Sequence, residues 1–190
     1  VKKVTEFLAK KQKDIKSLPS TCPSYFLDVK TLNGNIANIG IVNKNGDLIC
    51  TTKSSDTNIN ISDRPYFKNA IASKEFSIGH FQHDRSLKAQ SINFAYPILN
   101  ENNDIEGVIV TVIALDWWSS ALNTLNLSTE IRAVITDSNG SILANYPFSA
   151  DRLGNKLEKF DLAHNLQAGV IFKGKDGIRR VFHQTTLYSD

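Results

Sequence analysis

Residues 41–49 have the sequence IVNKNGDLI, in which two apolar runs flank an Asn-Gly turn. Asn and Gly tolerate a positive φ, so the stretch predicts a β-hairpin with strands over residues 36–42 and 47–52. A similar stretch, ITDSNGSIL, occupies residues 135–143, with its turn glycine 94 positions after the first. Asn-Gly hairpins are common, but each of these two follows a helical stretch and precedes a polar loop. The chain is therefore expected to contain two similar units in tandem.

Helices and further strands are expected around the first hairpin. The N-terminal stretch is rich in lysine and carries an apolar stripe, and Pro19 marks its end. Pro65 fits the first turn of another helix, which runs to about Ser73. Residues 105–115 are almost continuously apolar, which is typical of a strand buried on both faces. The other expected features are a stripe of Val4, Phe7, Leu8, Ile15 and Leu18, a helix over 25–32, an extended piece over 76–81, a strand over 91–99 and a helix from Asp116.

The second unit is expected to be incomplete at its C-terminus. The counterpart of the strand that ends at Leu115 would end 94 positions later, beyond Asp190. We therefore expect the natural protein to continue past this residue. The second unit is expected to contain a helical stretch over 160–167 and strands over 171–173 and 178–186. The predicted fold class is α+β with antiparallel sheets, organised as an N-terminal helical region (1–33), a first unit (34–126) and a truncated second unit (127–190).

Composition excludes several classes of protein. The 22 Lys and Arg residues against 19 Asp and Glu residues give a net charge of only +3, and the basic N-terminal helix carries one aromatic residue, Phe7. Nucleic-acid binding is therefore not expected. The longest apolar run, residues 107–115, is far shorter than the roughly 20 residues that cross a bilayer. No nucleophile elbow, phosphate-binding loop, zinc-protease motif or dinucleotide fingerprint occurs, so neither enzyme activity nor a cofactor is expected.

The two cysteines, Cys22 and Cys50, leave two states open. They are free thiols in a reducing compartment and can form one disulfide in an oxidising one. Neither has a CxxC neighbour, so a metal or redox motif is not indicated. His80, His83 and Asp84 could bind zinc, but their spacing in an extended segment favours an exposed loop, and no metal site is expected.

Four blocks of sequence, in this order, resemble a double-Cache (dCache) sensor domain. They are SDRPYFKNA at 62–70, FSIG at 76–79, FAYPI at 94–98 and IEGVI at 105–109. Together with the second unit, the resemblance covers nearly the whole chain. It implies a long N-terminal helix followed by two PAS-like units, and a ligand-sensing role without catalysis in this segment.

The resemblance also implies a location and an output. Such domains lie outside the bacterial inner membrane, between two transmembrane helices, so a periplasmic segment of a membrane-anchored protein is expected. A Cys22–Cys50 disulfide is then favoured over free thiols. The Asp-Arg-Pro-Tyr-Phe version resembles domains on GGDEF diguanylate cyclases and on histidine kinases, and a cyclase is the first expectation for the cytoplasmic output. A histidine kinase, a chemoreceptor or a non-sensing periplasmic interaction module are the alternatives. The stripe of the N-terminal helix is expected to pack against a second copy in a homodimer.

A ligand pocket is implied in the first unit, between its sheet and the loops and helix that follow the hairpin. Arg64 is expected to hold a carboxylate through two parallel hydrogen bonds. The alternative is that Arg64 caps the helix or pairs locally with Asp63, and that the nearby aromatic residues belong to the core. The expected ligand-binding residues are Arg64, Tyr66, Phe67, Phe81, His83 and Tyr96.

Members of this family that bind amino acids carry a fuller motif. It has an Arg, then Trp-Tyr, then a Tyr and an Asp, and a further Asp in the last strand. The Arg is kept here, Tyr66 and Phe67 stand at the Trp-Tyr positions, and Phe81 and His83 fall near the Tyr and Asp. Val112 falls where the last Asp would hold an ammonium group. Because the carboxylate anchor is kept and the amine anchor is lost, the resemblance argues against an α-amino acid. It leaves a small organic acid, another small molecule or no ligand as the alternatives.

Overall fold

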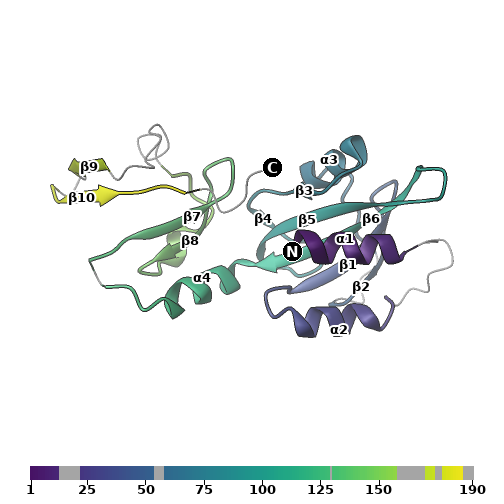
Figure 1. Ribbon diagram of the computed structural model, residues 1–190, viewed down its shortest axis with the longest axis horizontal. Coiled ribbons are helices and arrows are strands. Elements are labelled where there is room, and N and C mark those ends of the chain that lie inside the picture. The colour runs from purple at the N-terminus through teal and green to yellow at the C-terminus, as the bar shows by residue number, and fades with distance from the viewer. Residues whose placement is uncertain (13–21, 54–57, 129, 158–169, 174–176, 186–190) are drawn as a thin grey trace. The chain divides into compact units, whose positions relative to one another are not determined.

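The computed structural model of the chain describes residues 1–12, 22–53, 58–128, 130–157, 170–173 and 177–185 (Figure 1). It has two compact units, Val1–Asn155 and Lys156–Asp190. This division follows contacts in space, and the boundary expected after residue 126 from the sequence repeat stays a prediction. Helices combined with antiparallel strands confirm the expected α+β fold class.

One antiparallel sheet organises the larger unit. Its strand order is β2-β1-β6-β5-β3, and β4 also pairs with β5. In β6, every residue from Gly107 to Ile113 is buried, as the continuous apolar run predicted. The strands are β1 (Asn38–Asn43), β2 (Leu48–Thr51), β3 (Ser77–Ile78), β4 (Gln82–His83), β5 (Gln90–Leu99) and β6 (Ile105–Ala114).

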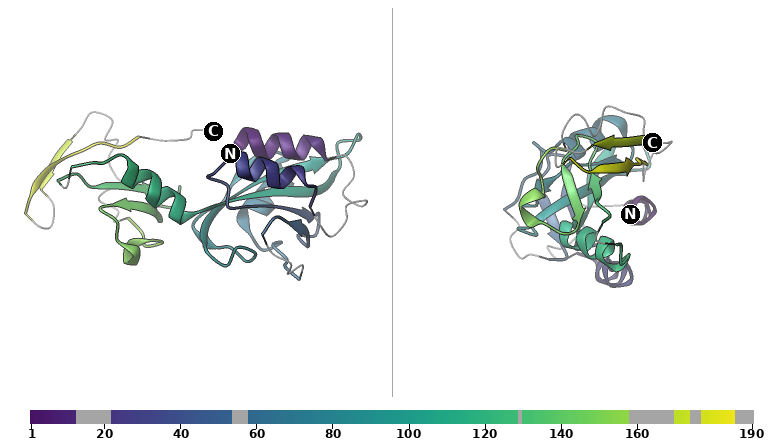
Figure 2. Two further views of the ribbon diagram at one scale, coloured as in Figure 1. Left: turned by 90° about the horizontal axis from the view of Figure 1, so that it is seen from below. Right: turned by 90° about the vertical axis from the view of Figure 1, so that its left-hand side faces the viewer.

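Helices α1 (Lys2–Lys11) and α2 (Tyr25–Leu32) cover one face of this sheet (Figures 1 and 2). Leu8 of α1 and Phe26 of α2 are fully buried there, in one cluster with Ile109 of β6. Phe7, expected in the buried stripe, is instead 50% exposed, because Leu8 and its neighbours form the buried side of α1. The expected stripe residues Ile15 and Leu18 lie outside the described residues.

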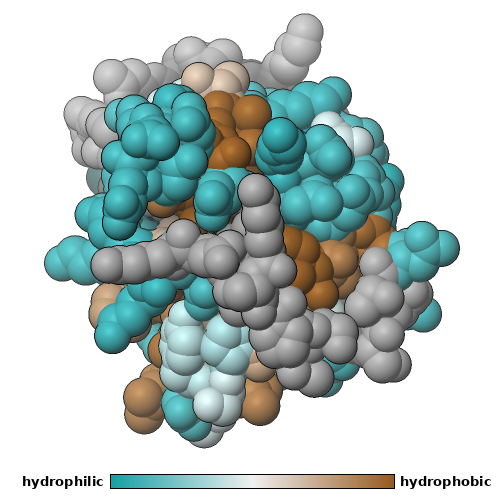
Figure 3. Space-filling model, turned by 90° about the vertical axis from the view of Figure 1, so that its right-hand side faces the viewer, coloured by the Kyte–Doolittle hydropathy of each residue, from teal (hydrophilic) through white to brown (hydrophobic). Residues whose placement is uncertain are grey.

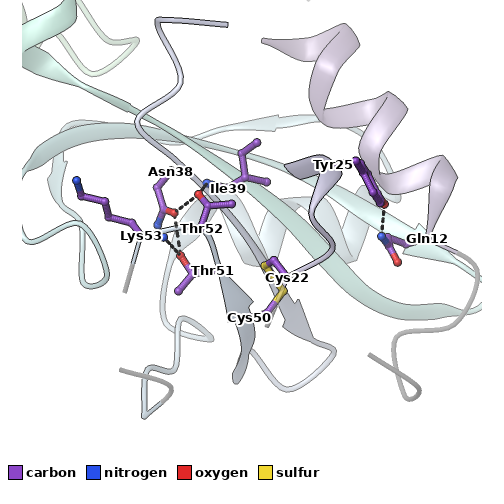
Figure 4. The surroundings of a disulfide bond; sticks show 9 residues. All are labelled: Gln12, Cys22, Tyr25, Asn38, Ile39, Cys50, Thr51, Thr52 and Lys53. Carbon is purple, nitrogen blue, oxygen red and sulfur yellow. Dashed lines mark hydrogen bonds between the residues drawn. A yellow bond between two sulfur atoms is a disulfide. The ribbon is translucent and has the colours of Figure 1, made fainter. Parts of the chain in front are cut away.

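A disulfide fixes α2 to the edge of the sheet (Figure 4). Cys22 lies just before α2 and Cys50 lies in β2, and their Cα atoms are 5.1 Å apart. Of the two states that the sequence left open, the structure has the bonded one. Gln12 donates a hydrogen bond to the hydroxyl of Tyr25 nearby, which ties the end of α1 to the start of α2.

Helix α3 (Pro65–Ser73) covers the opposite face of the sheet (Figure 2). It begins with Pro65, whose fixed φ suits the first helical turn. The residue that caps it is Arg64, with no side-chain hydrogen bond. Its buried side packs on the apolar residues of β5 and β6 that point away from α1.

The two hairpins that defined the sequence repeat have the same turn. The Oδ1 atom of Asn43 accepts backbone N–H groups two and four residues later, at 2.8 and 3.0 Å. The Oδ1 atom of Asp137 does the same, at 2.9 and 2.8 Å. Gly46 and Gly140 follow with φ angles of 86° and 74°. This agreement supports the repeat that the sequence indicated.

Helix α4 (Leu115–Thr124) leads from β6 to the second hairpin and packs against its second strand. That hairpin consists of β7 (Ala133–Thr136) and β8 (Ile142–Tyr146), followed by a 3₁₀ helix, η1 (Ala150–Arg152). The smaller unit contains an antiparallel pair, β9 (Val170–Lys173) and β10 (Arg179–Phe182). The helix expected over 160–167 lies outside the described residues. Among the helices of the described residues, none is long and apolar enough to cross a membrane.

Candidate functional site

Arg64 lies at the start of α3, on the face of the sheet opposite α1. Its Nη2 atom donates a hydrogen bond to the backbone oxygen of His83 at 3.2 Å, the side-chain hydrogen bond found for it among the described residues. The local pairing with Asp63 that the sequence left open does not form, because Asp63 pairs with Arg85. The half-buried guanidinium of Arg64 therefore keeps N–H donors for a further acceptor.

Tyr66 and Phe67 are core residues of the face covered by α3. They are 2% and 4% exposed and lie in one cluster with Ala95 and Val112. The Tyr66 hydroxyl accepts a hydrogen bond from Nδ2 of Asn93 at 3.2 Å. Burial raises the pKa of Tyr66, so the phenol stays neutral and its proton remains available as a donor.

A buried polar network extends from Tyr66 across the sheet. Nδ2 of Asn93 also donates to Oδ2 of Asp84 at 2.8 Å, and Ser91 donates to Oδ1 of Asn93 at 2.8 Å. The other oxygen of Asp84 accepts the backbone N–H groups of Ser86 and Leu87, at 3.0 and 2.6 Å. Residues 91, 93 and 95 of β5 share one face because strand side chains alternate, which is why this network lies under α3.

Gln82 leaves one buried donor unused in this network. Its side chain lies close enough to the Tyr66 hydroxyl to offset part of the pKa rise that burial causes. Its buried Nε2 amide nevertheless reaches no acceptor with good hydrogen-bond geometry within the described part of the chain. A buried amide without a partner costs about 1–3 kcal/mol. A ligand oxygen bound here would recover that cost.

An ion pair closes the loop that follows β4. Arg85 donates to both carboxylate oxygens of Asp63, at 2.7 and 2.8 Å, and also to the backbone oxygen of Asn60. The hydrogen bond from Arg85 holds the pKa of Asp63 below its ordinary value. We call residues 84–89 the latch loop, since this pair fastens it to the segment before α3.

The side chains of three of the six expected ligand-binding residues lie away from Arg64 and the Tyr66 network. The Phe81 ring packs with Phe94 and Leu143, beyond the edge of the polar network. The His83 side chain is exposed, and only its backbone oxygen reaches Arg64. Tyr96 lies on the α1 face, because it follows Ala95 by one residue in the strand.

Tyr96 instead lines a different cavity, of about 490 Å³, between α1 and the β5–β6 turn. The space-filling view from that end shows a mostly hydrophilic surface with apolar side chains in the recesses (Figure 3). The cavity is lined by Ala9, Lys10, Gln12, Tyr96, Pro97, Leu99, Asn100, Glu101 and Asn102.

The sequence of the chain matches the family model for the Cache domain, dCache_1, over residues 2–186. The chain belongs to the Cache domain family. This finding confirms the resemblance that residues 62–70 and the three later blocks carried.

Individual relatives of this Cache domain are distant. Sporulation kinase D of Bacillus subtilis (strain 168) is 23% identical over 124 residues, which cover 65% of this chain and 24% of the kinase. The extracellular domain of the putative histidine kinase rpHK1S-Z16 has a similar structure, with a TM-score of 0.72 at 16% identity over 83% of this chain and 68% of that one. The ligand-binding domain of the Pseudomonas fluorescens chemoreceptor CtaA, solved with L-alanine, gives a TM-score of 0.67 at 15% identity, covering 94% of this chain and 76% of that one. The chain thus spans about a quarter of the curated relative that it matches.

At one position, the structure differs from the correspondence that was expected with the ligand motif. His83 was expected near the motif's Asp, but the acid at the buried face is Asp84, one residue later. Val112 is buried among apolar side chains on the same face. Sequence reasoning missed Gln82, Asp84 and Asn93, although Gln82-x-Asp84 has the Tyr-x-Asp spacing and could have been found by shifting the alignment by one residue.

Proposed function

We propose that this Cache domain senses a small molecule through a site formed by Arg64, Gln82 and Tyr66, and that the ligand carries a carboxylate. The observation that carries this proposal is a pair of donors that both lie near Tyr66, the partly free guanidinium of Arg64 and the buried Nε2 of Gln82. A carboxylate offers oxygens to both. Asp84 is occupied by donors of its own loop and by Asn93, which argues against an ammonium group as the main anchor.

We further propose that the parent protein is a membrane-anchored receptor with this domain outside the cytoplasm. A disulfide between Cys22 and Cys50 fits an oxidising compartment. For the output domain, the relatives named above are kinases and a chemoreceptor, so a histidine kinase is now the better proposal than the GGDEF cyclase suggested by the sequence. The homodimer expected through α1 stays a prediction, and Phe7 is the stripe residue that α1 leaves exposed for it.

A thermal-shift panel tests the ligand proposal. The chain is melted with acetate, lactate, succinate or fumarate, with the matching neutral amides, and with L-alanine. At a concentration 100-fold above Kd, a bound acid should stabilise the fold by about 2.7 kcal/mol, or about 5–10 °C in Tm. The amides should have little effect.

Two variants connect a positive result to the site. Gln82→Ala should reduce the shift in Tm, and Arg64→Ala should abolish it. Lys74→Ala is the matched control, because Lys74 lies just past the other end of α3 and donates to the backbone oxygen of Asn103 at 2.7 Å. A shift that survives in both Arg64→Ala and Gln82→Ala would remove these residues from the site.

A further inference from the structure

Residues 79–83 contact the candidate site on one side. We call them the bridge segment. The Gly79 backbone N–H donates to the backbone oxygen of Asn93 at 2.7 Å. A Cβ atom at Gly79 would lie 2.9 Å from the ring of Tyr66, so the backbone passes directly against that ring. At the other end of the segment, the His83 oxygen accepts the hydrogen bond from Arg64, and the Gln82 side chain lies beside the Tyr66 hydroxyl.

The same segment contacts the β7–β8 hairpin through its middle residues. The Phe81 backbone N–H donates to Oδ2 of Asp137 at 2.8 Å. The Phe81 ring packs directly on Gly154, where a Cβ atom would come within 2.5 Å of the ring. Nδ1 of His80 is 4.0 Å from Oδ2 of Asp137 and 3.4 Å from Oγ of Ser138.

Asp137 links the bridge segment rigidly to the turn of that hairpin. The residue is 8% exposed, and its two oxygens have different partners. Oδ1 accepts the N–H groups of Asn139 and Ser141 within the turn, while Oδ2 accepts the N–H of Phe81. Because one planar carboxylate holds both sets of donors, the turn and the bridge segment cannot shift independently without breaking a buried hydrogen bond.

We infer that the bridge segment couples the candidate ligand site to the β7–β8 hairpin, with Phe81 as its main contact. This inference rests on the proposed function, since it concerns regulation through that site. A ligand that draws Arg64 away from His83, or engages Gln82, changes the contacts at one end of a five-residue segment. The hairpin is held to the segment through Phe81 and Asp137. Its equilibrium between conformations therefore shifts together with that of the bridge segment. Phe81 acts here as a positioning residue and does not touch the ligand.

Hydrogen exchange of the ligand-free chain tests this coupling without any knowledge of the ligand. Arg64→Ala removes the hydrogen bond to His83 and touches no atom of the hairpin. It should speed amide exchange across residues 133–146 by about threefold to tenfold, the effect of losing one hydrogen bond on a local opening. Lys74→Ala, which breaks a similar bond to a different carbonyl, should leave these amides unchanged. Rates are normalised to residues 92–98 of β5, so that a general loss of stability cancels.

A Phe81→Ala background identifies the route. The effect of Arg64→Ala on the hairpin should be clearly smaller there, because the ring contact with Gly154 is lost while the backbone hydrogen bond from residue 81 to Asp137 remains. The hairpin's own exchange will be faster in this background. Hairpin rates that stay unchanged in Arg64→Ala would overturn the inference, as would an effect of full size in the Phe81→Ala background. Neither result depends on the thermal-shift panel, so the coupling and the ligand proposal can fail separately.

Discussion

Asp63 and Arg85 form a two-pronged ion pair, with O···N distances of 2.7 and 2.8 Å. Asp63 lies just before α3 and Arg85 lies in the latch loop. Their side chains are 59% and 40% exposed, so water screens the attraction and the pair adds little to the overall free energy of unfolding. Its main effect is on the position of the latch loop.

Breaking this pair should loosen the latch loop without unfolding the domain. We expect Asp63→Asn to lower the free energy of unfolding by less than about 1 kcal/mol. Amide exchange in residues 84–89 should nevertheless become clearly faster, and added salt should produce part of this effect in the unchanged protein. Glu6→Gln is the control, because it breaks the Glu6–Lys10 pair on α1, far from the loop in the chain. Equal loop exchange in Asp63→Asn and the original chain would contradict the latch assignment.

The same pair gives a pH dependence with a defined sign. Hydrogen bonding from Arg85 lowers the folded-state pKa of Asp63 below its ordinary value of 3.8. The contribution of the ion pair to the free energy of unfolding is therefore fully present above that ordinary value. It is lost as the pH falls through the lower folded-state pKa. In urea unfolding, the stability difference between the original chain and Asp63→Asn should be constant near neutral pH and shrink below pH 3.8. A difference that grows in acid would show that the pKa is shifted the other way.

The disulfide should supply a large part of the stability. Cys22 and Cys50 are 28 residues apart, and closing a loop of this length stabilises a fold by about 3–4 kcal/mol in the chain-entropy model. A double variant, Cys22→Ser with Cys50→Ser, should lose that amount in urea unfolding. The original chain with reductant should give the same midpoint as the variant. If the oxidised chain and the variant unfold at equal urea concentrations, the bond does not constrain the chain.

Substituting Asn93 should lower the free energy of unfolding more than substituting Tyr66. Asn93→Ala leaves a carboxylate oxygen of Asp84 and the hydroxyls of Ser91 and Tyr66 without their partner, for a cost of about 1–3 kcal/mol or more. Tyr66→Phe removes the long hydrogen bond from Asn93 and the contact with Gln82, but it keeps the bond between Asn93 and Asp84, for about 0.5–1.5 kcal/mol. Urea unfolding of both variants checks the order, and the reverse order would mean that Tyr66 is the residue on which the network depends.

Local chemistry made part of this fold predictable from the sequence. The side chains of Asn43 and Asp137 organise their own turns, and the glycine of each turn takes a positive φ, so the hairpins are encoded within a few residues. Pro65 marks the start of α3 for the same reason.

The site was less predictable because it depends on strand pairing and on an irregular segment. Tyr96 and Ala95 are neighbours in sequence but face opposite sides of β5, and only the pairing with β6 decides which side carries the site. Asp84 lies beyond two short strands, where a shift of one residue exchanges it with His83. The contact of Phe81 with Gly154 joins residues far apart in the chain, which no local pattern indicates.

Gly154 offers a test of that last contact by steric conflict. Its φ is 78°, which is strained for any other residue, and a Cβ atom would lie 2.5 Å from the Phe81 ring. Gly154→Ala should therefore destabilise the chain by about 2–4 kcal/mol, combining roughly 1 kcal/mol of backbone strain with 1–3 kcal/mol of overpacking. Gly34→Ala is the matched control, because its Cβ would meet no atom within 4 Å, and it should be neutral or slightly stabilising.

A double variant separates the two causes in Gly154→Ala. Removing the Phe81 ring with Phe81→Ala makes room for the new methyl group but leaves the backbone strain at Gly154. In the Phe81→Ala background, Gly154→Ala should then cost only about 1 kcal/mol. The two substitutions are therefore strongly non-additive if the ring rests on this glycine. If they are additive within about 0.5 kcal/mol, the ring does not pack on Gly154, and the bridge segment loses its main contact with the hairpin region.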